Sequence, residues 1–248
     1  MKAMIFSAGL GTRFKPWTDH HPKALAVVNG KSLLQRNIEY LQQYGITDVL
    51  INVHHFADQV IEAVNKNQGW GSKITISDEK DELLDTGGGL LKAKDFFTPG
   101  ESLITCNADI LTDLDIHKLV SFHQKQKALI SFGVTERKTS RYLLFDENNR
   151  LCGWRNKKTG EEKISIPAYL SGEVLGMRQE MAYSCVVVFD YDIFRLMQEY
   201  NFSGKFSLID VYLALAANHL ILGYDHTGDK FVDVGKPESI ALAASIFI

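Results

Sequence analysis

Cysteine is scarce in this chain, and its spacing excludes two common roles. The 248 residues include three cysteines, Cys106, Cys152 and Cys185, an odd number spread far apart. They fit neither a disulfide framework nor the paired spacing of a zinc site. We therefore expect reduced thiols and a cytoplasmic protein.

Long apolar runs and an excess of one charge are also missing. No stretch is long enough to span a bilayer, and Arg13 and Lys15 follow the first short apolar run too closely for a secretory signal. The formal net charge is -3, with both signs interspersed, so no global field attracts nucleic acid or an anionic membrane. We expect small-molecule partners, with no nucleic acid, no membrane and no obligate protein partner.

Two familiar phosphate-binding motifs are absent near the N-terminus. No Gly-Lys-Ser/Thr follows the glycines, which excludes a P-loop, and Phe14 stands where a dinucleotide fingerprint needs a third small residue. A Rossmann oxidoreductase is therefore disfavoured.

What is present, after the expected strand 3–6, is a small-residue turn followed by two cations. Ala8, Gly9 and Gly11 let the chain turn sharply and bring backbone N–H groups close to an anion. Arg13 adds a planar charged fork suited to phosphate oxygens, and two prolines hold Lys23 near the same place. A nucleotide enzyme is the leading interpretation, and a glycine turn with solvated cations is the alternative.

Helix and strand patterns alternate along the chain, which predicts an α/β fold with a mixed, mostly parallel sheet flanked by helices. Ser32 caps a helix that ends at Gly45. Strands are expected at 48–54, 103–106, 129–134, 186–189 and 220–224. We expect residues 1–248 to form a single domain, in which residues 137–183, with a turn at Asn148-Asn149, form a small β-rich insertion along one wall of the site.

Two aspartates are candidate ligands of Mg²⁺. Asp109, in Asn107-Ala108-Asp109, follows an expected strand, and Asp233 lies between two valines. A polar residue inside a strand-like run needs a partner, and magnesium is held by one or two carboxylates with substrate phosphates. The alternative for Asp109 is a loop residue that caps the next segment.

The sequence Leu84-Asp-Thr-Gly-Gly-Gly89 is a candidate nucleobase site. Three glycines leave room for a flat base against the backbone, with Thr86 and free amides at its edge. A flexible turn before a helix near Leu90 is the alternative. The acidic residues just upstream, including Glu79, are expected to form a solvated face.

These motifs together resemble the sugar-1-phosphate nucleotidyltransferases. The resemblance covers essentially the whole chain and looks closest to the branch that includes N-acetylmuramate-1-phosphate uridylyltransferases and mannose-1-phosphate guanylyltransferases. It is carried, in this order, by GLGTRFKPWT, HHPKAL, LDTGGG, NAD and VDVGKPESI.

The resemblance implies a Rossmann-like nucleotidyltransferase fold, Mg²⁺, and transfer from a nucleoside triphosphate to a sugar 1-phosphate with release of diphosphate. UTP is favoured, and GTP with mannose 1-phosphate is the alternative. Arg13 and Lys23 take the catalytic roles, and Asp109 and Asp233 hold the metal. The nucleotide-binding residues implied are Ala8, Gly9, Gly11, Thr12, Arg13, Lys23, Thr86 and Gly87.

The sugar side departs from the family pattern. The usual Glu-Lys-Pro is absent, and Arg155 or Lys157 is the candidate replacement, with hairpin-surface cations as the alternative. Asn107 and Ser184 are expected near the sugar phosphate. Cys185 stands where relatives have glycine, which puts the sugar identity in doubt.

Two rival functions remain open. A related glycosyltransferase normally carries Asp-x-Asp, but Asn107 occupies its first position. A non-catalytic nucleotide or sugar-phosphate sensor would not need the two aspartates that this chain has.

Overall fold

The computed structural model describes residues 1–166 and 179–248. Strands and helices alternate through the chain. The first half contains β1 (Ala3–Phe6), β2 (Val27–Val28), β3 (Lys31–Ser32), α1 (Leu33–Gln43), β4 (Asp48–Val53), α2 (Ala57–Lys66), β5 (Lys73–Asp78), α3 (Asp85–Lys92), β6 (Leu103–Asn107), β7 (Ile110–Thr112) and α4 (Ile116–Gln126). The second half contains β8 (Ile130–Thr135), β9 (Arg141–Phe145), β10 (Leu151–Asn156), β11 (Glu162–Ile164), β12 (Gln179–Phe189), α6 (Ile193–Glu199), α7 (Leu208–Leu215), β13 (Ile221–Asp225), β14 (Phe231–Asp233) and α8 (Ser239–Ile246).

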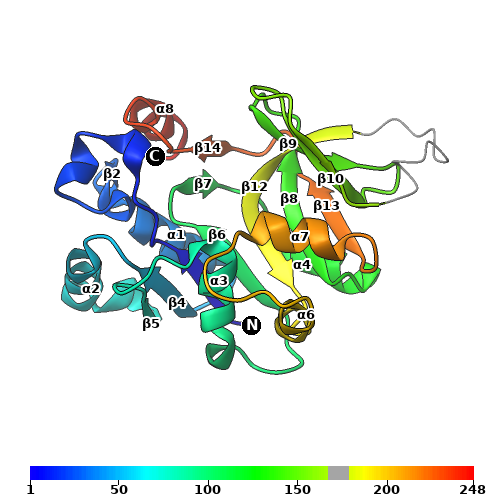
Figure 1. Cartoon of the computed structure of the whole chain (residues 1–248). Helices are drawn as coiled ribbons and strands as arrows, with labels where there is room; N and C mark the ends of the chain where they lie inside the picture. Colours follow the sequence, from blue (N-terminus) through cyan, green and yellow to red (C-terminus); the bar gives the residue numbers. More distant parts are fainter. Residues whose placement is uncertain (167–178) are drawn as a thin grey trace.

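Within the described residues, ten strands form one mixed sheet (Figure 1). Its order is β11-β10-β9-β12-β6-β1-β4-β5, and β8 joins β12 to β13. The strands β5, β4, β1 and β6 are parallel, whereas β12 is antiparallel to β6, β8 and β9. The predicted α/β class is confirmed. Because Phe6 pairs with Asn107, the turn after β1 and the end of β6 emerge at the same edge of the sheet.

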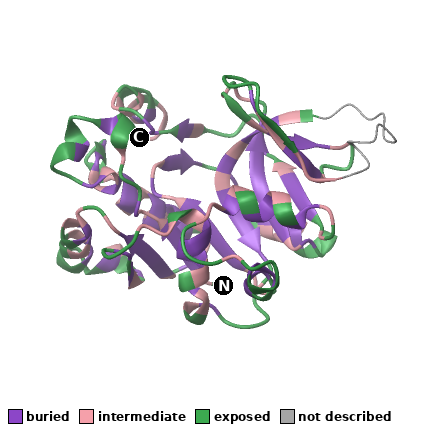
Figure 2. Cartoon of the chain, in the orientation of Figure 1, coloured by how far each residue is buried: buried purple, intermediate pink, exposed green. Residues whose placement is uncertain are grey.

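Helices cover both faces of the sheet, because alternate side chains of a strand point to opposite faces. In β1, Met4 packs with α3, α6 and α7, while Ala3 and Ile5 pack with α1, α2 and α4. Figure 2 shows the central strands as the buried layer between these helices. A third cluster, which includes Phe14, Leu111 and Val232, holds β7 and β14 against the N-terminal loops and α8.

Several local predictions are confirmed. The Ser32 hydroxyl accepts a hydrogen bond from the amide of Gln35 at 3.1 Å, and Gly45 follows α1 with a φ of 71°. The turn at Asn148-Asn149 joins the antiparallel strands β9 and β10. Residues 167–178 of the predicted insertion lie outside the described residues. The strand predicted at 186–189 is longer, because β12 also pairs with β9 from Gln179 onward.

The alternative interpretation of the glycine triplet, a flexible turn before Leu90, is wrong. Helix α3 begins at Asp85, so Gly87–Gly89 lie inside the helix and not in a turn before Leu90. A Cβ at Gly87 would lie 2.4 Å from the Phe206 ring. Gly87 and Gly88 therefore allow close packing of α3 against the segment before α7, Gly89 faces Glu79 and Asn52, and all three glycines are buried.

Glu79, expected on a solvated face, is only 1% exposed. Its carboxylate accepts hydrogen bonds from the Asn52 side chain at 2.8 Å and from the Leu84 amide at 3.2 Å. Asn52 in turn accepts from the Ser7 amide at 2.8 Å. Glu79 is buried because these donors replace water around the carboxylate, and it links β4 to the segment before α3, while Asn52 links β4 to the turn after β1.

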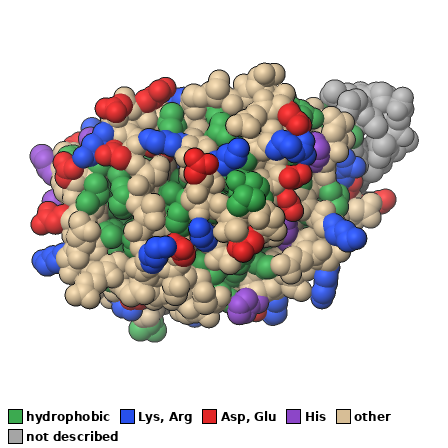
Figure 3. Space-filling model, turned by 90° about the horizontal axis from the view of Figure 1, so that it is seen from below, with side chains coloured by type: hydrophobic (Ala, Val, Ile, Leu, Met, Phe, Trp, Pro, Cys, Tyr) green, Lys and Arg blue, Asp and Glu red, His purple; other side chains and the backbone are tan. Residues whose placement is uncertain are grey.

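The surface carries side chains of both positive and negative charge. Figure 3 shows lysines and arginines interspersed with aspartates and glutamates on the face seen from below. Among the described residues, no helix has the length and apolar character needed to cross a bilayer.

We expect Glu79→Ala to lower the free energy of unfolding by about 2–3 kcal/mol, because the Asn52 amide would be left buried without a partner. Denaturant unfolding followed by circular dichroism measures this change. Glu82→Ala, at an exposed position of the same loop, is the control and should change stability by less than about 0.5 kcal/mol. Equal effects of the two substitutions would contradict the network.

Candidate functional site

The turn after β1 is shaped by Gly11. Its φ of 60° is left-handed, and a Cβ there would lie 2.8 Å from Thr18 Cγ2 and 3.2 Å from Lys23 Cβ. Glycine therefore lets the following loop pack directly against the turn. At Gly9 the situation differs, because no atom lies within 4 Å of the corresponding Cβ position. The backbone at Gly9 borders open space in which a ligand fits.

Two carboxylates meet at the end of the β7–β14 pair. Asp233 pairs with Ile110, the residue after Asp109, and the Val234 amide donates to the Asp109 carbonyl at 2.9 Å. The Lys23 ammonium forms an ion pair with the Asp109 carboxylate. Residues far apart in the sequence therefore lie together beside the turn after β1, and their roles stay a prediction.

Arg13 lies beside the second carboxylate. A Cβ at Gly235 would lie 2.8 Å from Asp233 Oδ1 and 3.1 Å from Arg13 Nη2, so glycine leaves room for both groups. Burial and the neighbouring Asp109 raise the pKa of Asp233, and Lys23 and Arg13 offset part of this rise. The arrangement concentrates negative charge that a cation would neutralise.

Two adjoining cavities share the turn and Asp109. The smaller, about 190 Å³, is lined by Gly9, Gly11, Thr12, Arg13, Lys23 and Asp109. The larger, about 400 Å³, is lined by Ala8, Gly9, Thr12, Asn52, Thr86, Asn107, Asp109 and Lys205, among others. Together they form a cleft along the carboxyl ends of the parallel strands. Lys205 is a cation of this cleft that sequence reasoning missed, because nothing around it in the sequence sets it apart from other lysines.

The predicted base-binding residues behave differently from one another. Thr86 lines the larger cavity, and its hydroxyl accepts a hydrogen bond from the Leu208 amide at 3.0 Å. The amides of Gly87 and Gly88 both donate to the Phe206 carbonyl, at 2.9 and 3.3 Å. They are therefore not free to bind a base in this conformation, and the role of Gly87 stays a prediction.

Of the predicted sugar-side residues, Asn107 lines the larger cavity together with Asp109, whereas Ser184, Arg155 and Lys157 do not line the cleft. The buried Ser184 hydroxyl pairs with His226 Nε2 at 2.8 Å. Arg155 pairs with Glu162 and Glu180, and Lys157 pairs with Glu180 at 2.5 Å. These cations are neutralised on the outer antiparallel strands and do not line the cleft.

Cys185, the residue after Ser184, lies near the carboxylates. Burial, Asp109 and Asp233 all raise the pKa of its thiol, which disfavours the reactive thiolate. Its φ of 58° is left-handed, at an irregularity in the pairing of β12 with β8. A position with this backbone suits glycine, and cysteine is strained there.

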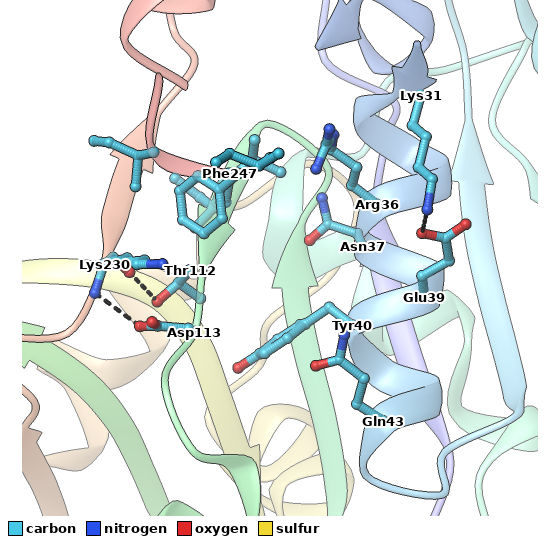
Figure 4. A pocket seen from close by; sticks show the side chains of 14 residues that line it. Lys31, Arg36, Asn37, Glu39, Tyr40, Gln43, Thr112, Asp113, Lys230 and Phe247 are labelled. Carbon is cyan, nitrogen blue, oxygen red and sulfur yellow. Dashed lines mark hydrogen bonds and ion pairs between the residues drawn. The ribbon is translucent and has the colours of Figure 1, made fainter. Parts of the chain in front are cut away.

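A separate cavity of about 380 Å³ lies between α1 and the β7 segment (Figure 4). Its charged groups are largely paired: Arg36 donates to the Val28 carbonyl at 2.8 and 2.9 Å, and Lys31 pairs with Glu39 at 2.6 Å. Neither Asp109, Asp233 nor the glycine turn lines it. We therefore assign the chemistry to the cleft and not to this cavity.

A sequence profile described as Nucleotidyl transferase matches residues 2–246, so the chain belongs to that family. Several individual relatives match over shorter stretches. The chain is 30% identical over 180 residues to a UTP--glucose-1-phosphate uridylyltransferase of Synechocystis sp., which is 66% of this chain and 46% of that protein. It is 42% identical over 94 residues to an N-acetylmuramate alpha-1-phosphate uridylyltransferase of Caulobacter vibrioides, which is 37% of this chain and 38% of that protein.

Guanylyltransferases also match. Mannose-1-phosphate guanyltransferase beta-B of Xenopus laevis is 32% identical over 126 residues, or 50% of this chain and 35% of that protein. The chain thus spans about half or less of the length of these curated relatives. Among solved structures, HddC from Yersinia pseudotuberculosis has a TM-score of 0.78 at 22% identity, covering 100% of this chain and 99% of that one. At this identity the structural likeness shows the fold.

We expect Cys185→Gly to change the free energy of unfolding by less than about 1 kcal/mol, because relief of left-handed strain offsets the entropy of glycine and the lost side chain. Cys185→Val should cost about 2 kcal/mol, since a β-branched residue is strained further. Cys106, which is buried in the ordinary strand β6, is the control and should tolerate valine better than glycine. Thermal unfolding of the glycine and valine variants at Cys185 and at Cys106 tests whether the preferred residue differs between the two positions. The same preference at both positions would contradict the expectation.

Proposed function

We propose that this chain transfers a nucleotidyl group from a nucleoside triphosphate to a sugar 1-phosphate, giving a nucleoside diphosphate sugar and diphosphate. The observation that carries the proposal is the convergence of Asp109 and Asp233 with Lys23 and Arg13 at the glycine turn. Membership of the Nucleotidyl transferase family supports it. We further propose a cytoplasmic location, which the three free cysteines support.

In the proposed reaction, a phosphate oxygen of the sugar 1-phosphate attacks the α-phosphorus in line. A new P–O bond forms, and the bond to the β-phosphate oxygen breaks, so diphosphate leaves with the electron pair. Both reactants are anions, and catalysis therefore rests on positioning and charge neutralisation. Arg13 holds the departing phosphates with its planar fork, and Lys23 leaves Asp109 to meet the α-phosphate.

The two carboxylates fit Mg²⁺. Among the described residues, no group of three or more His, Cys, Asp or Glu side chains could hold a metal ion. A pair of carboxylates at an open cleft suits a hard cation that completes its shell with water and substrate phosphates. When bound, such an ion supplies positive charge to the reacting phosphates. We propose that Asp109 and Asp233 hold it.

We propose UTP as the preferred nucleotide. The 42% identical segment belongs to a uridylyltransferase, and the Synechocystis relative is also a uridylyltransferase. GTP with mannose 1-phosphate is the second candidate, which the guanyltransferase match supports. A non-catalytic sensor of nucleotides or sugar phosphates is the alternative of a different class.

A matrix of four nucleoside triphosphates against hexose 1-phosphates, including N-acetylmuramate 1-phosphate, tests the activity through diphosphate release. We expect release that requires both substrates and is fastest with UTP. A clear preference for GTP with mannose 1-phosphate would overturn the choice of nucleotide. Nucleotide binding without release from any pair would support the sensor instead.

We expect Asp109→Asn and Asp233→Asn each to cut diphosphate release by at least about 10²-fold, because each removes a carboxylate that would bind the metal. Without ligand, Asp233→Asn should unfold at the same or a higher temperature, because burial and the neighbouring Asp109 carboxylate raise the pKa of Asp233 and so oppose its charged form. Magnesium with UTP should stabilise the wild type strongly and the variants weakly. Normal turnover by both variants, or by the wild type in excess chelator, would refute the metal site.

A further inference from the structure

Among the described residues, Arg137 is a cation near the carboxylates whose charge the foregoing account does not use, as is Lys205 of the larger cavity. Arg137 follows β8 and is half-buried. Its Nη2 donates to the Tyr183 carbonyl at 2.8 Å, and its guanidinium lies over the Phe231 ring, 4.5 Å from the centroid. Its Nε is buried without a hydrogen-bond partner. The side chain is therefore fixed in position while part of its donor capacity remains unused.

The fixed position keeps this charge within electrostatic range of Asp233, although Arg137 is not among the residues that line the two cavities. Phe231 and Asp233 are two residues apart on β14, so their side chains lie on the same side of the strand. Asp233 and Cys185 are both close enough to interact electrostatically with the Arg137 guanidinium. Arg13 also interacts with Asp233. The Asp233 carboxylate thus lies within range of two arginines, one from the glycine turn and one from the start of the β-rich insertion.

The two arginines differ in what they can bind. Arg13 belongs to the turn that borders the nucleotide cavities. Arg137 stands beside Cys185 and precedes the outer strands, whose own cations Arg155 and Lys157 are already paired with glutamates. A second anion that reacts beside the carboxylates needs a cation on this side, and Arg137 is suited to it because it is already partly desolvated and held in place.

Resting on the proposed function, we infer that Arg137 binds the phosphate group of the sugar 1-phosphate. Its planar fork, anchored by Tyr183 and Phe231, offers N–H donors to a phosphate monoester while Arg13 and Lys23 hold the triphosphate. Arg137 thereby takes the part that sequence reasoning gave to Arg155 or Lys157.

Steady-state kinetics of Arg137→Lys and Arg137→Gln test this inference. We expect the KM for the sugar 1-phosphate to rise about 10- to 100-fold in Arg137→Gln and less in Arg137→Lys, because lysine keeps the charge but not the fork. The dissociation constant for UTP should stay within about twofold of the wild type. A uniform loss of kcat with unchanged KM would overturn the inference.

Arg150→Lys is a matched control. Arg150 is also half-buried, donates to the carbonyls of Ala216 and Ala217 at 2.9 and 3.1 Å, and has a buried Nε without a partner. It belongs to neither the cleft nor the carboxylate group. A purely structural effect of losing a guanidinium should appear equally in both lysine variants, whereas the inference requires a changed KM only at Arg137.

Calorimetric binding of glucose 1-phosphate and N-acetylmuramate 1-phosphate separates this inference from the proposed function. If the wild type binds a hexose 1-phosphate but releases no diphosphate, the proposed activity fails, and loss of binding in Arg137→Gln still supports the inference. If the wild type turns over and Arg137→Gln keeps its KM, the inference fails while the activity stands. If the wild type binds neither compound, the inference fails too.

Discussion

The backbone pairing of β7 with β14 is the constraint on which the candidate site depends. It brings Asp109 and Asp233, which are distant in the sequence, to one end of a short antiparallel ladder. A buried apolar cluster that contains Leu111, Val232 and Phe14 packs against this strand pair and stabilises it. Apolar burial therefore compensates for the repulsion between the two carboxylates, and the loop that carries Arg13 is packed against the same cluster.

Local sequence patterns predicted most of the fold. The Ser32 cap and the apolar strands form as expected because each depends on neighbours in the chain or on simple alternation. Glu79 and the glycine triplet did not follow, because their environments come from distant segments, Asn52 in one case and Phe206 in the other. An acidic residue in a polar stretch is predicted to be exposed. The prediction changes only when the buried hydrogen-bond donors that contact its carboxylate are known.

The sequence indicates the site residues that belong to short motifs. It does not indicate those whose position depends on packing between distant segments. Lys23, Asp109 and Asp233 meet at the glycine turn because β6 ends beside β1 and β14 pairs with β7. Arg137 stands among other charged and polar residues, and no local signal separates it from Lys138. Its position depends on the Tyr183 carbonyl and the Phe231 ring, which only the tertiary structure brings together.

The late place of β14 in the chain affects the order of events during synthesis. A nascent chain that ends before Phe231 already contains every strand of the described central sheet and the helices on both of its faces. It lacks β14 and α8. It would present Asp109 with its Lys23 ion pair, but no second carboxylate and no partner for β7. A chain that ended there would therefore lack the second carboxylate of the candidate site, and the cleft is complete only when the C-terminal segment pairs with β7.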